Sequence, residues 1–452
     1  SLDKILEIPM TPQQLHDEIL EKVREYYRLV HAPAQAAPFE PGVSYLNYGG
    51  RIFDEREMVN LVDSALEFWL TAGRYTREFE RKLAEYLGVH SALLVNSGSS
   101  ANLLAFMTLT APELGERRIN RGDEVITVAA GFPTTVAPLL QYGAVPVFVD
   151  IEPDTANIDV SLLEAARSER TRAVMLAHTL GNPFQLHAVR AFCDRYHLWL
   201  IEDNCDALGS RFAGRLTGTW GDIGTSSFYP PHHMTTGEGG ALYTDDPQLF
   251  RIARSLRDWG RDCQCNSGED GLCGRRFTGK FGKLPAGYDH KYVYSRFGYN
   301  LKVSDMQAAV GCAQLEKLPE FVEQRRRNFR FLFEALHDLP ELALCRSYPE
   351  SDPAWFGFLI TLAPGVKFTR TALTRHLEEH RIQTRNLFAG NLTCHPCFEP
   401  LTEGKEYRIV GSLAATDRIM NDAFWIGVYP GMTEEKLAYM AETIRKFCRE
   451  HD

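Results

Sequence analysis

The chain of 452 residues has no long hydrophobic run. No apolar stretch approaches the roughly 20 residues that a helix needs to cross a bilayer, so we expect no transmembrane segment. The first residues carry no secretory signal, and we therefore expect a cytoplasmic protein. Positive charge is also in deficit: the net charge of −10 argues against general binding to nucleic acids or to anionic membranes.

Cysteine is too sparse for a disulfide scaffold, with ten in the whole chain. In a reducing compartment most of these residues should be free thiols, so a local concentration of cysteine points to a metal site instead. Six of the ten share no spacing and are expected to be mostly core thiols: Cys193, Cys312, Cys345, Cys394, Cys397 and Cys448. Cys394 and Cys397 form a C-x2-C pair, but no second pair lies nearby to complete a zinc site.

Short β-rich segments alternate with helical ones in the first half of the chain. The expected strands are residues 92–96, 124–128, 145–149, 173–177 and 198–202, and the expected helices between them are 100–111, 134–141, 160–168 and 186–196. Near-continuous apolar strands between helices predict an α/β fold with a mostly parallel sheet covered by helices on both faces. Ligands of such sheets bind beyond the carboxyl ends of the strands.

Helical patterns flank this region on both sides. Residues 11–31 have helical periodicity after a Thr-Pro start, and 32–41 form an Ala/Pro-rich linker. Residues 55–87 are also helical in pattern, with a break at 71–74, and a charged helical pattern covers 314–339. The predicted domains are an N-terminal helical arm with its linker (1–48), a large ligand-binding domain (49–320) and a smaller α+β C-terminal domain (321–452).

The most unusual stretch is SFYPPHHMTTGEGGAL, residues 227–242. A strand end is broken by two prolines, and His232 and His233 then precede a Gly-rich turn into another strand. Such a turn brings the backbone close to a ligand. Taken alone, the pattern is more often a tight loop with two surface histidines.

This stretch resembles the cofactor-lysine loop of the DegT/DnrJ/EryC1/StrS sugar aminotransferases, which use pyridoxal 5′-phosphate (PLP). Members typically carry a lysine, then Asn, an apolar residue and TTGEGG, and His232 stands at the lysine position. An imidazole cannot form the Schiff base, so ordinary transamination is not expected. The same replacement is typical of a small subgroup, the sugar-nucleotide 4-keto-6-deoxyhexose 3-dehydrases.

The resemblance implies a fold of the PLP-dependent aspartate aminotransferase type (type I) and assigns phosphate contacts. Gly98 and Ser99 lie in a turn that opens a helix, which by itself is only a weak phosphate signal. Within the family they match phosphate contacts, as does Ser227. Asn300 matches an asparagine that reaches the cofactor phosphate from the neighbouring subunit, which implies a homodimer with shared active sites.

Three further residues match family positions around the cofactor ring. Asp203 matches the aspartate that keeps the pyridine nitrogen protonated, although a helix N-cap would also explain an Asp there. Asp206 matches the family's Gln or His next to the cofactor. Phe132 matches the aromatic residue that stacks on the ring, although core packing explains a Phe equally well.

A second unusual stretch, DCQCNSGEDGLC at residues 262–273, holds Cys263, Cys265 and Cys273. Three thiolates fall short of the four that an iron–sulfur cluster or a structural zinc requires. Cys205, two residues after Asp203, is the best candidate for the fourth. The residues alone favour iron–sulfur and zinc about equally. The pattern C-x57-C-x-C-x7-C is similar to that of the [2Fe-2S] dehydrases in the subgroup, which favours the cluster.

The resemblance therefore implies a 3-dehydrase that uses pyridoxamine 5′-phosphate (PMP) and a [2Fe-2S] cluster. It would act on a nucleotide-linked 4-keto-6-deoxyhexose, with a separate NAD(P)H-flavin iron–sulfur reductase, in the biosynthesis of 3,6-dideoxyhexoses of O-antigens. His232 would remove a proton from C4′ of PMP, a role suited to the near-neutral pKa of an ordinary imidazole.

The sequence leaves two questions open, the nucleotide of the substrate and the class of protein. The resemblance, which includes the segments at 287–300 and 384–393, implies a CDP-linked substrate, but TDP-linked relatives exist. A non-redox dehydratase of the same fold is a second hypothesis, against which the cysteine set argues. A regulatory or scaffold protein without catalysis is a third, against which the retained Asp203 and His232 argue.

Overall fold

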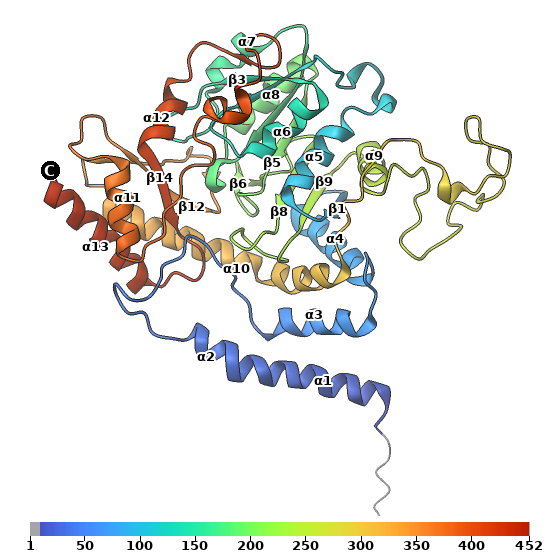
Figure 1. Ribbon diagram of the computed structural model, residues 1–452, viewed down its shortest axis with the longest axis horizontal. Coiled ribbons are helices and arrows are strands. Elements are labelled where there is room, and N and C mark those ends of the chain that lie inside the picture. The colour runs from blue at the N-terminus through green and yellow to red at the C-terminus, as the bar shows by residue number, and fades with distance from the viewer. Residues whose placement is uncertain (1–9, 452) are drawn as a thin grey trace, which may run out of the picture.

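The computed structural model describes residues 10–451 and shows an α/β fold around a mostly parallel sheet (Figure 1). The eight strands follow the order β1-β9-β8-β5-β4-β2-β3-β13, and only β9 runs antiparallel to its two neighbours. Their bounds are β1 Ser91–Val95, β2 Glu124–Val128, β3 Val145–Val149, β4 Thr171–Ala177, β5 Trp199–Asp203, β8 Ile223–Ser227, β9 Gly240–Thr244 and β13 Arg408–Ile409. Each of the five predicted strands is present, displaced by at most two residues.

Helices cover both faces of this sheet. Alternate residues of β4 enter different core clusters, Val174 and Leu176 on one side and Ala173 and Met175 on the other. The covering helices are α5 Gly98–Thr108, α6 Pro133–Tyr142, α7 Leu163–Ala166, α8 Leu186–Tyr196 and α9 Pro247–Arg257. The helix expected at 160–168 is broken, because a 3₁₀ turn (η3, Val160–Leu162) precedes α7.

The N-terminal arm is helical and packs below the body (Figure 1). Helix α1 (Pro12–Tyr26) begins at Thr11, whose side chain caps it, as the Thr-Pro start predicted. The expected linker is partly helical, since η1 (Tyr27–His31) continues α1 and α2 (Ala32–Gln35) follows. The break predicted near 71–74 separates α3 (Glu55–Glu67) from α4 (Arg74–Leu87).

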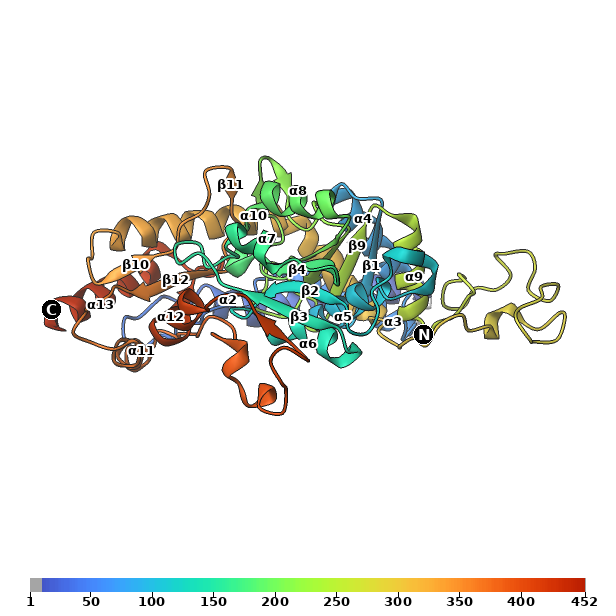
Figure 2. The ribbon, with the colours of Figure 1, turned by 90° about the horizontal axis from the view of Figure 1, so that it is seen from above.

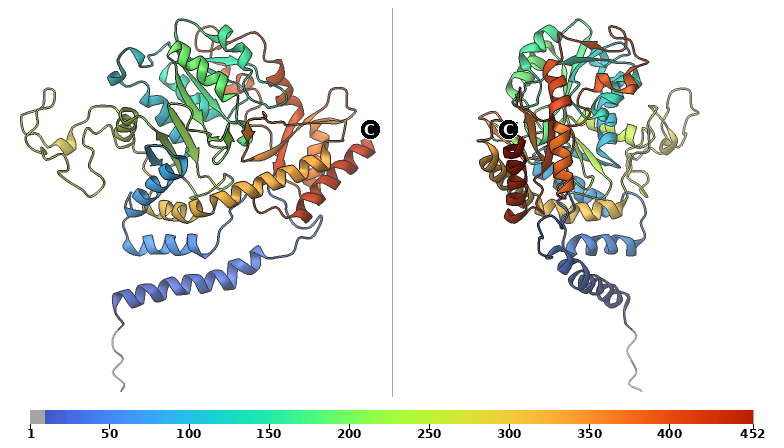
Figure 3. Two further views of the ribbon diagram at one scale, coloured as in Figure 1. Left: turned by 180° about the vertical axis from the view of Figure 1, so that it is seen from behind. Right: turned by 60° about the vertical axis from the view of Figure 1, so that its left-hand side comes forward.

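Helix α10 (Asp305–Leu336) runs from the region of the large sheet into the C-terminal part of the chain (Figures 1 and 3). It begins nine residues before the predicted 314, because Ser304 forms a capping box with Gln307, and it runs through the predicted domain boundary at 320. The C-terminal part contains an antiparallel sheet with three helices. Its elements are β10 Leu342–Leu344, β12 Gly357–Leu362, β14 Ala423–Gly427, α11 Arg370–Glu379, α12 Ala414–Asp422 and α13 Glu434–His451.

The remaining segment of note lies between α9 and α10 and projects from the body (Figures 1 and 2). Its regular structure is limited to one 3₁₀ turn, η5 (His290–Tyr292). A separate small sheet joins β11 (Ser351–Asp352) to β6 (Arg211–Phe212) and β7 (Arg215–Leu216). Between residues 10 and 451 no helix combines the length and the apolarity that crossing a membrane requires.

Candidate active site

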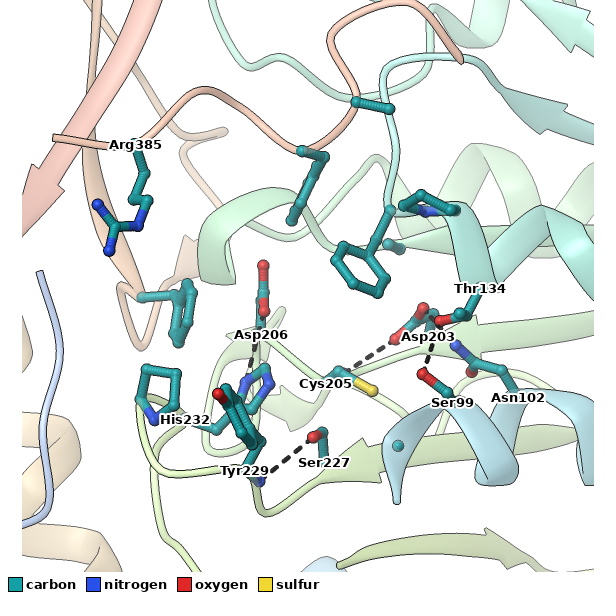
Figure 4. A pocket seen from close by; sticks show the side chains of 18 of the residues that line it. Ser99, Asn102, Thr134, Asp203, Cys205, Asp206, Ser227, Tyr229, His232 and Arg385 are labelled. Atoms are coloured by element: carbon teal, nitrogen blue, oxygen red, sulfur yellow. Dashed lines mark hydrogen bonds and ion pairs between the residues drawn. The ribbon is translucent and has the colours of Figure 1, made fainter. Parts of the chain in front are cut away.

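A cavity of about 490 Å³ opens beyond the carboxyl ends of the parallel strands (Figure 4). Ala177, Asp203 and Ser227, which end β4, β5 and β8, all line it. Eight of the residues predicted from the sequence line this cavity: Gly98, Ser99, Phe132, Asp203, Cys205, Asp206, Ser227 and His232. None of the described residues that line it is a lysine, so nothing there could form a Schiff base with a cofactor.

One end of the cavity suits a phosphate group. The N-terminus of α5 opens there, and the amide N–H groups of a first helical turn attract an anion. Gly98 is required at this point, because a Cβ on it would lie 2.4 Å from the Cβ of Ser227 and 3.0 Å from the Sγ of Cys205. The hydroxyl of Ser99 donates to that of Thr134 at 3.0 Å, which adds a second hydroxyl at the same end.

Asp203 is held by neighbouring helices. Its Oδ2 accepts hydrogen bonds from Nδ2 of Asn102 at 2.8 Å and from Oγ1 of Thr135 at 2.7 Å. Its Oδ1 accepts the backbone N–H of Cys205 at 3.1 Å. These bonds fix the carboxylate at the cavity wall, where it can pair with a protonated ring nitrogen. Asn102 lies one helical turn after Gly98, and Thr135 belongs to the GFPTT motif, so both were within reach of sequence reasoning that missed them.

His232 and Asp206 both line the cavity, and each has one buried polar atom without a hydrogen-bond partner. These atoms are Nδ1 of His232 and Oδ2 of Asp206, and Nδ1 lies 3.5 Å from the other carboxyl oxygen of Asp206. Burial lowers the pKa of His232 to about 4, with the Arg325 guanidinium acting in the same direction and Asp203 opposing. Burial also raises the pKa of Asp206 well above its usual range. The folded environment therefore moves the pKa of His232 away from the near-neutral value of an ordinary imidazole.

Arg325, on α10, fixes the loop that carries His232. It is 1% exposed and donates to the carbonyl oxygens of Pro231 and His232, each at 3.3 Å. Its other amino group donates to the carbonyls of Trp355 and Phe356. Because the His232 ring stacks on that of Phe356, with centroids 5.0 Å apart, Arg325 joins both partners of the stack. The sequence pattern of a charged helix gave no sign of this role.

His233 occupies a different position from His232. Its Nε2 bonds to the carbonyl of Ala354 at 2.5 Å, the residue is 2% exposed, and it does not line the cavity. Adjacent residues of the loop thus point in different directions, with His232 toward the cavity and His233 into the core.

The four predicted cluster cysteines do not come together. Cys205 lines the cavity, whereas Cys263, Cys265 and Cys273 lie on the projecting segment, where they line a small separate cleft with His290. Among residues 10–451 no group of three or more His, Cys, Asp or Glu side chains is placed to hold a metal ion. The physical reason is that Cys205 follows β5 inside the sheet edge, while the segment after α9 leads away from the body (Figures 1 and 2). The arrangement within one chain does not fit a four-cysteine cluster.

Asn300 also lies outside the cavity of its own chain. It is exposed at the base of the projecting segment, and its Oδ1 accepts a hydrogen bond from Nζ of Lys302 at 2.9 Å. Its role in a neighbouring subunit stays a prediction.

A model of the DegT/DnrJ/EryC1/StrS aminotransferase family matches residues 52–445. The chain belongs to this family. It is 52% identical over 439 residues to the lipopolysaccharide biosynthesis protein RfbH of Salmonella typhimurium, covering 97% of this chain and 99% of that one. It is 50% identical over 431 residues to dTDP-4-dehydro-2,6-dideoxy-D-glucose 3-dehydratase of Saccharopolyspora spinosa, covering 95% and 92%.

Solved structures share the fold of this chain. A histidine-to-asparagine mutant of GDP-4-keto-6-deoxymannose-3-dehydratase with bound GDP-perosamine matches with a TM-score of 0.80 at 27% identity, covering 89% of this chain and 100% of that one. The Escherichia coli enzyme with bound hydrated PLP matches with the same TM-score, at 27% identity and 89% and 99% coverage. The predicted family and the PLP-dependent aminotransferase-like fold are both confirmed. The anion site at the N-terminus of α5 and the fixed carboxylate of Asp203 fit a cofactor of this kind.

Proposed function

We propose that this protein is a PMP-dependent 3-dehydrase of a nucleotide-linked 4-keto-6-deoxyhexose, acting in deoxysugar biosynthesis. The observation that carries the proposal is the position of His232, a histidine in place of the family lysine, on the cavity wall with Asp203 and Asp206. The similarity to proteins named as sugar-nucleotide 3-dehydratases supports the same reaction class.

The side chains of the cavity have separate tasks in this reaction. When bound, PMP would supply a primary amine and a ring that can accept electrons. Gly98 and Ser99 at the N-terminus of α5 would hold its phosphate, and Asp203 would keep the ring nitrogen protonated. His232, whose pKa burial lowers, would accept a proton from C4′.

Two finer assignments follow from the sequence. We propose a CDP-linked substrate on the basis of the segments at 287–300 and 384–393, with a dTDP-linked sugar as the second candidate because of the S. spinosa relative. We also propose a cytoplasmic homodimer in which Asn300 completes the neighbouring subunit's phosphate site.

The redox part of the proposal rests on the resemblance of the cysteine spacing to that of the [2Fe-2S] dehydrases in the subgroup. The pattern C-x57-C-x-C-x7-C supports a [2Fe-2S] cluster that receives electrons from a separate NAD(P)H-flavin reductase. In the described arrangement Cys205 lies apart from Cys263, Cys265 and Cys273. A four-cysteine cluster therefore requires either that the projecting segment moves or that a second subunit supplies this segment.

The deciding experiment follows hydrogen exchange between solvent and C4′ of PMP in the presence of candidate CDP- and dTDP-linked 4-keto-6-deoxyhexoses. His232→Asn should slow this exchange by about 10²–10⁴-fold, the usual cost of losing a general base. His233→Asn is the matched control, because His233 is adjacent but does not line the cavity. If His232→Asn exchanges at the parent rate and His233→Asn does not exchange, the general base is His233 and not His232. No exchange with any such sugar would refute the reaction class.

A further inference from the structure

Arg385 lies at the end of the cavity opposite the predicted phosphate site. Figure 4 shows its side chain across the cavity from Ser99 and Asp203. Its backbone is fixed by two hydrogen bonds to Trp425 of β14, at 3.0 Å and 2.7 Å. Among the described residues that line the cavity it is the only lysine or arginine, so this end has a single, well-anchored permanent cation.

The charge of Arg385 is held in place but not neutralised. Its guanidinium lies 4.1 Å from the centroid of the Tyr48 ring, and Nη1 donates to the carbonyl of its neighbour Thr384 at 2.8 Å. Between residues 10 and 451 it forms no ion pair with a carboxylate. An aromatic face positions a guanidinium without cancelling its charge. The remaining N–H groups are therefore available to an anion that enters the cavity.

The identity of that anion follows from the two ends of the cavity. The N-terminus of α5 serves the cofactor phosphate, so a second anion must belong to the other ligand. Tyr48, Phe356 and Trp425 form an aromatic wall beside Arg385, which suits a sugar or a nucleobase attached to the anion. We propose that Arg385 binds the diphosphate of the sugar nucleotide and that Tyr48 holds its guanidinium in position. This inference rests on the proposed function, which supplies a substrate with a diphosphate.

The test measures binding of CDP, dTDP and cytidine to the PMP-loaded protein by calorimetry. Arg385→Ala should weaken diphosphate binding about 10- to 100-fold, as expected for the loss of charge-assisted hydrogen bonds, and leave cytidine and PMP affinity unchanged. Arg385→Lys, which keeps the charge but loses the planar fork, should fall between. Arg381→Ala is the matched control, since Arg381 is an exposed arginine on the same segment that does not line the cavity. It should bind CDP as the parent does.

The remaining outcomes distinguish a failure of the inference from a failure of the proposed substrate. A parent protein that binds neither CDP nor dTDP overturns the proposed nucleotide-linked substrates and this inference together. A parent that binds CDP, with Arg385→Ala binding it equally well, overturns the role of Arg385 alone. L-Glutamate is the second probe: if Arg385→Ala loses glutamate binding but keeps CDP binding, Arg385 recognises a carboxylate and the diphosphate assignment is wrong.

Discussion

Burial of His232 makes the stability of the protein depend on pH in a predictable direction. The pKa of His232 in the folded protein is about 4, compared with about 6.5 for an exposed imidazole. The unfolded chain therefore binds a proton between these two values that the folded protein does not bind. Stability should fall as the pH drops below about 6.5, by about 2 kcal/mol between pH 8 and pH 5 and by about 3 kcal/mol below pH 4.

The proton on His232 can be observed directly. In histidine-labelled protein without PMP, the NMR signal that disappears in His232→Asn should stay neutral down to pH 5 and titrate near pH 4. Denaturant unfolding at pH 8 and pH 5 gives the energetic counterpart. The parent should lose about 2 kcal/mol more than His232→Asn over this interval, whereas His90→Asn, at an exposed histidine, should behave as the parent does.

Two results would refute this reasoning. The first is a titration midpoint of His232 near 6.5. It would mean that water or a nearby carboxylate stabilises the protonated ring in the folded protein. The second is an equal loss of stability in the parent and in His232→Asn, which would show that other groups carry the pH dependence. In either case the neutral base of the proposed mechanism would have to be reconsidered.

Three further perturbations have defined outcomes. Replacing Cys263, Cys265 or Cys273 with Ser should remove iron and visible absorption from anaerobically purified protein; stoichiometric zinc without iron in the parent contradicts the cluster. Asn300→Ala should weaken PMP retention without unfolding the chain, and a fully active monomer in sedimentation would exclude the shared site. Asp305 is fully buried and accepts from the N–H groups of Gly73, Tyr75 and Thr76 at the start of α4. Asp305→Ala should therefore cost about 2–4 kcal/mol in denaturant unfolding, and Asp305→Asn less; an unchanged stability would contradict this capping role.

The fold was accessible from the sequence because its signals are local. Buried parallel strands are short apolar runs, and each of the five predicted ones was found within two residues of its position. The start of α10 was missed because the capping box of Ser304 and Gln307 is a pattern of single residues, whereas the charged periodicity becomes visible only further along. The helix predicted at 160–168 was too long, because helix propensity does not reveal a switch from 3₁₀ to α geometry.

The sequence by itself predicted eight residues that line the cavity, since strand ends and the helix N-terminus that follow one another in a parallel sheet converge at one edge. It also determined that no lysine stands in the TTGEGG loop. Only the tertiary structure decided the properties that depend on distant segments. Arg325 from α10 and Phe356 from near β12 set the position and pKa of His232, and Arg385 supplies the far cation of the cavity. The separation of Cys205 from the other three cysteines was also decided only by the tertiary structure. Spacing along a chain does not fix the direction in which a long segment leaves the sheet.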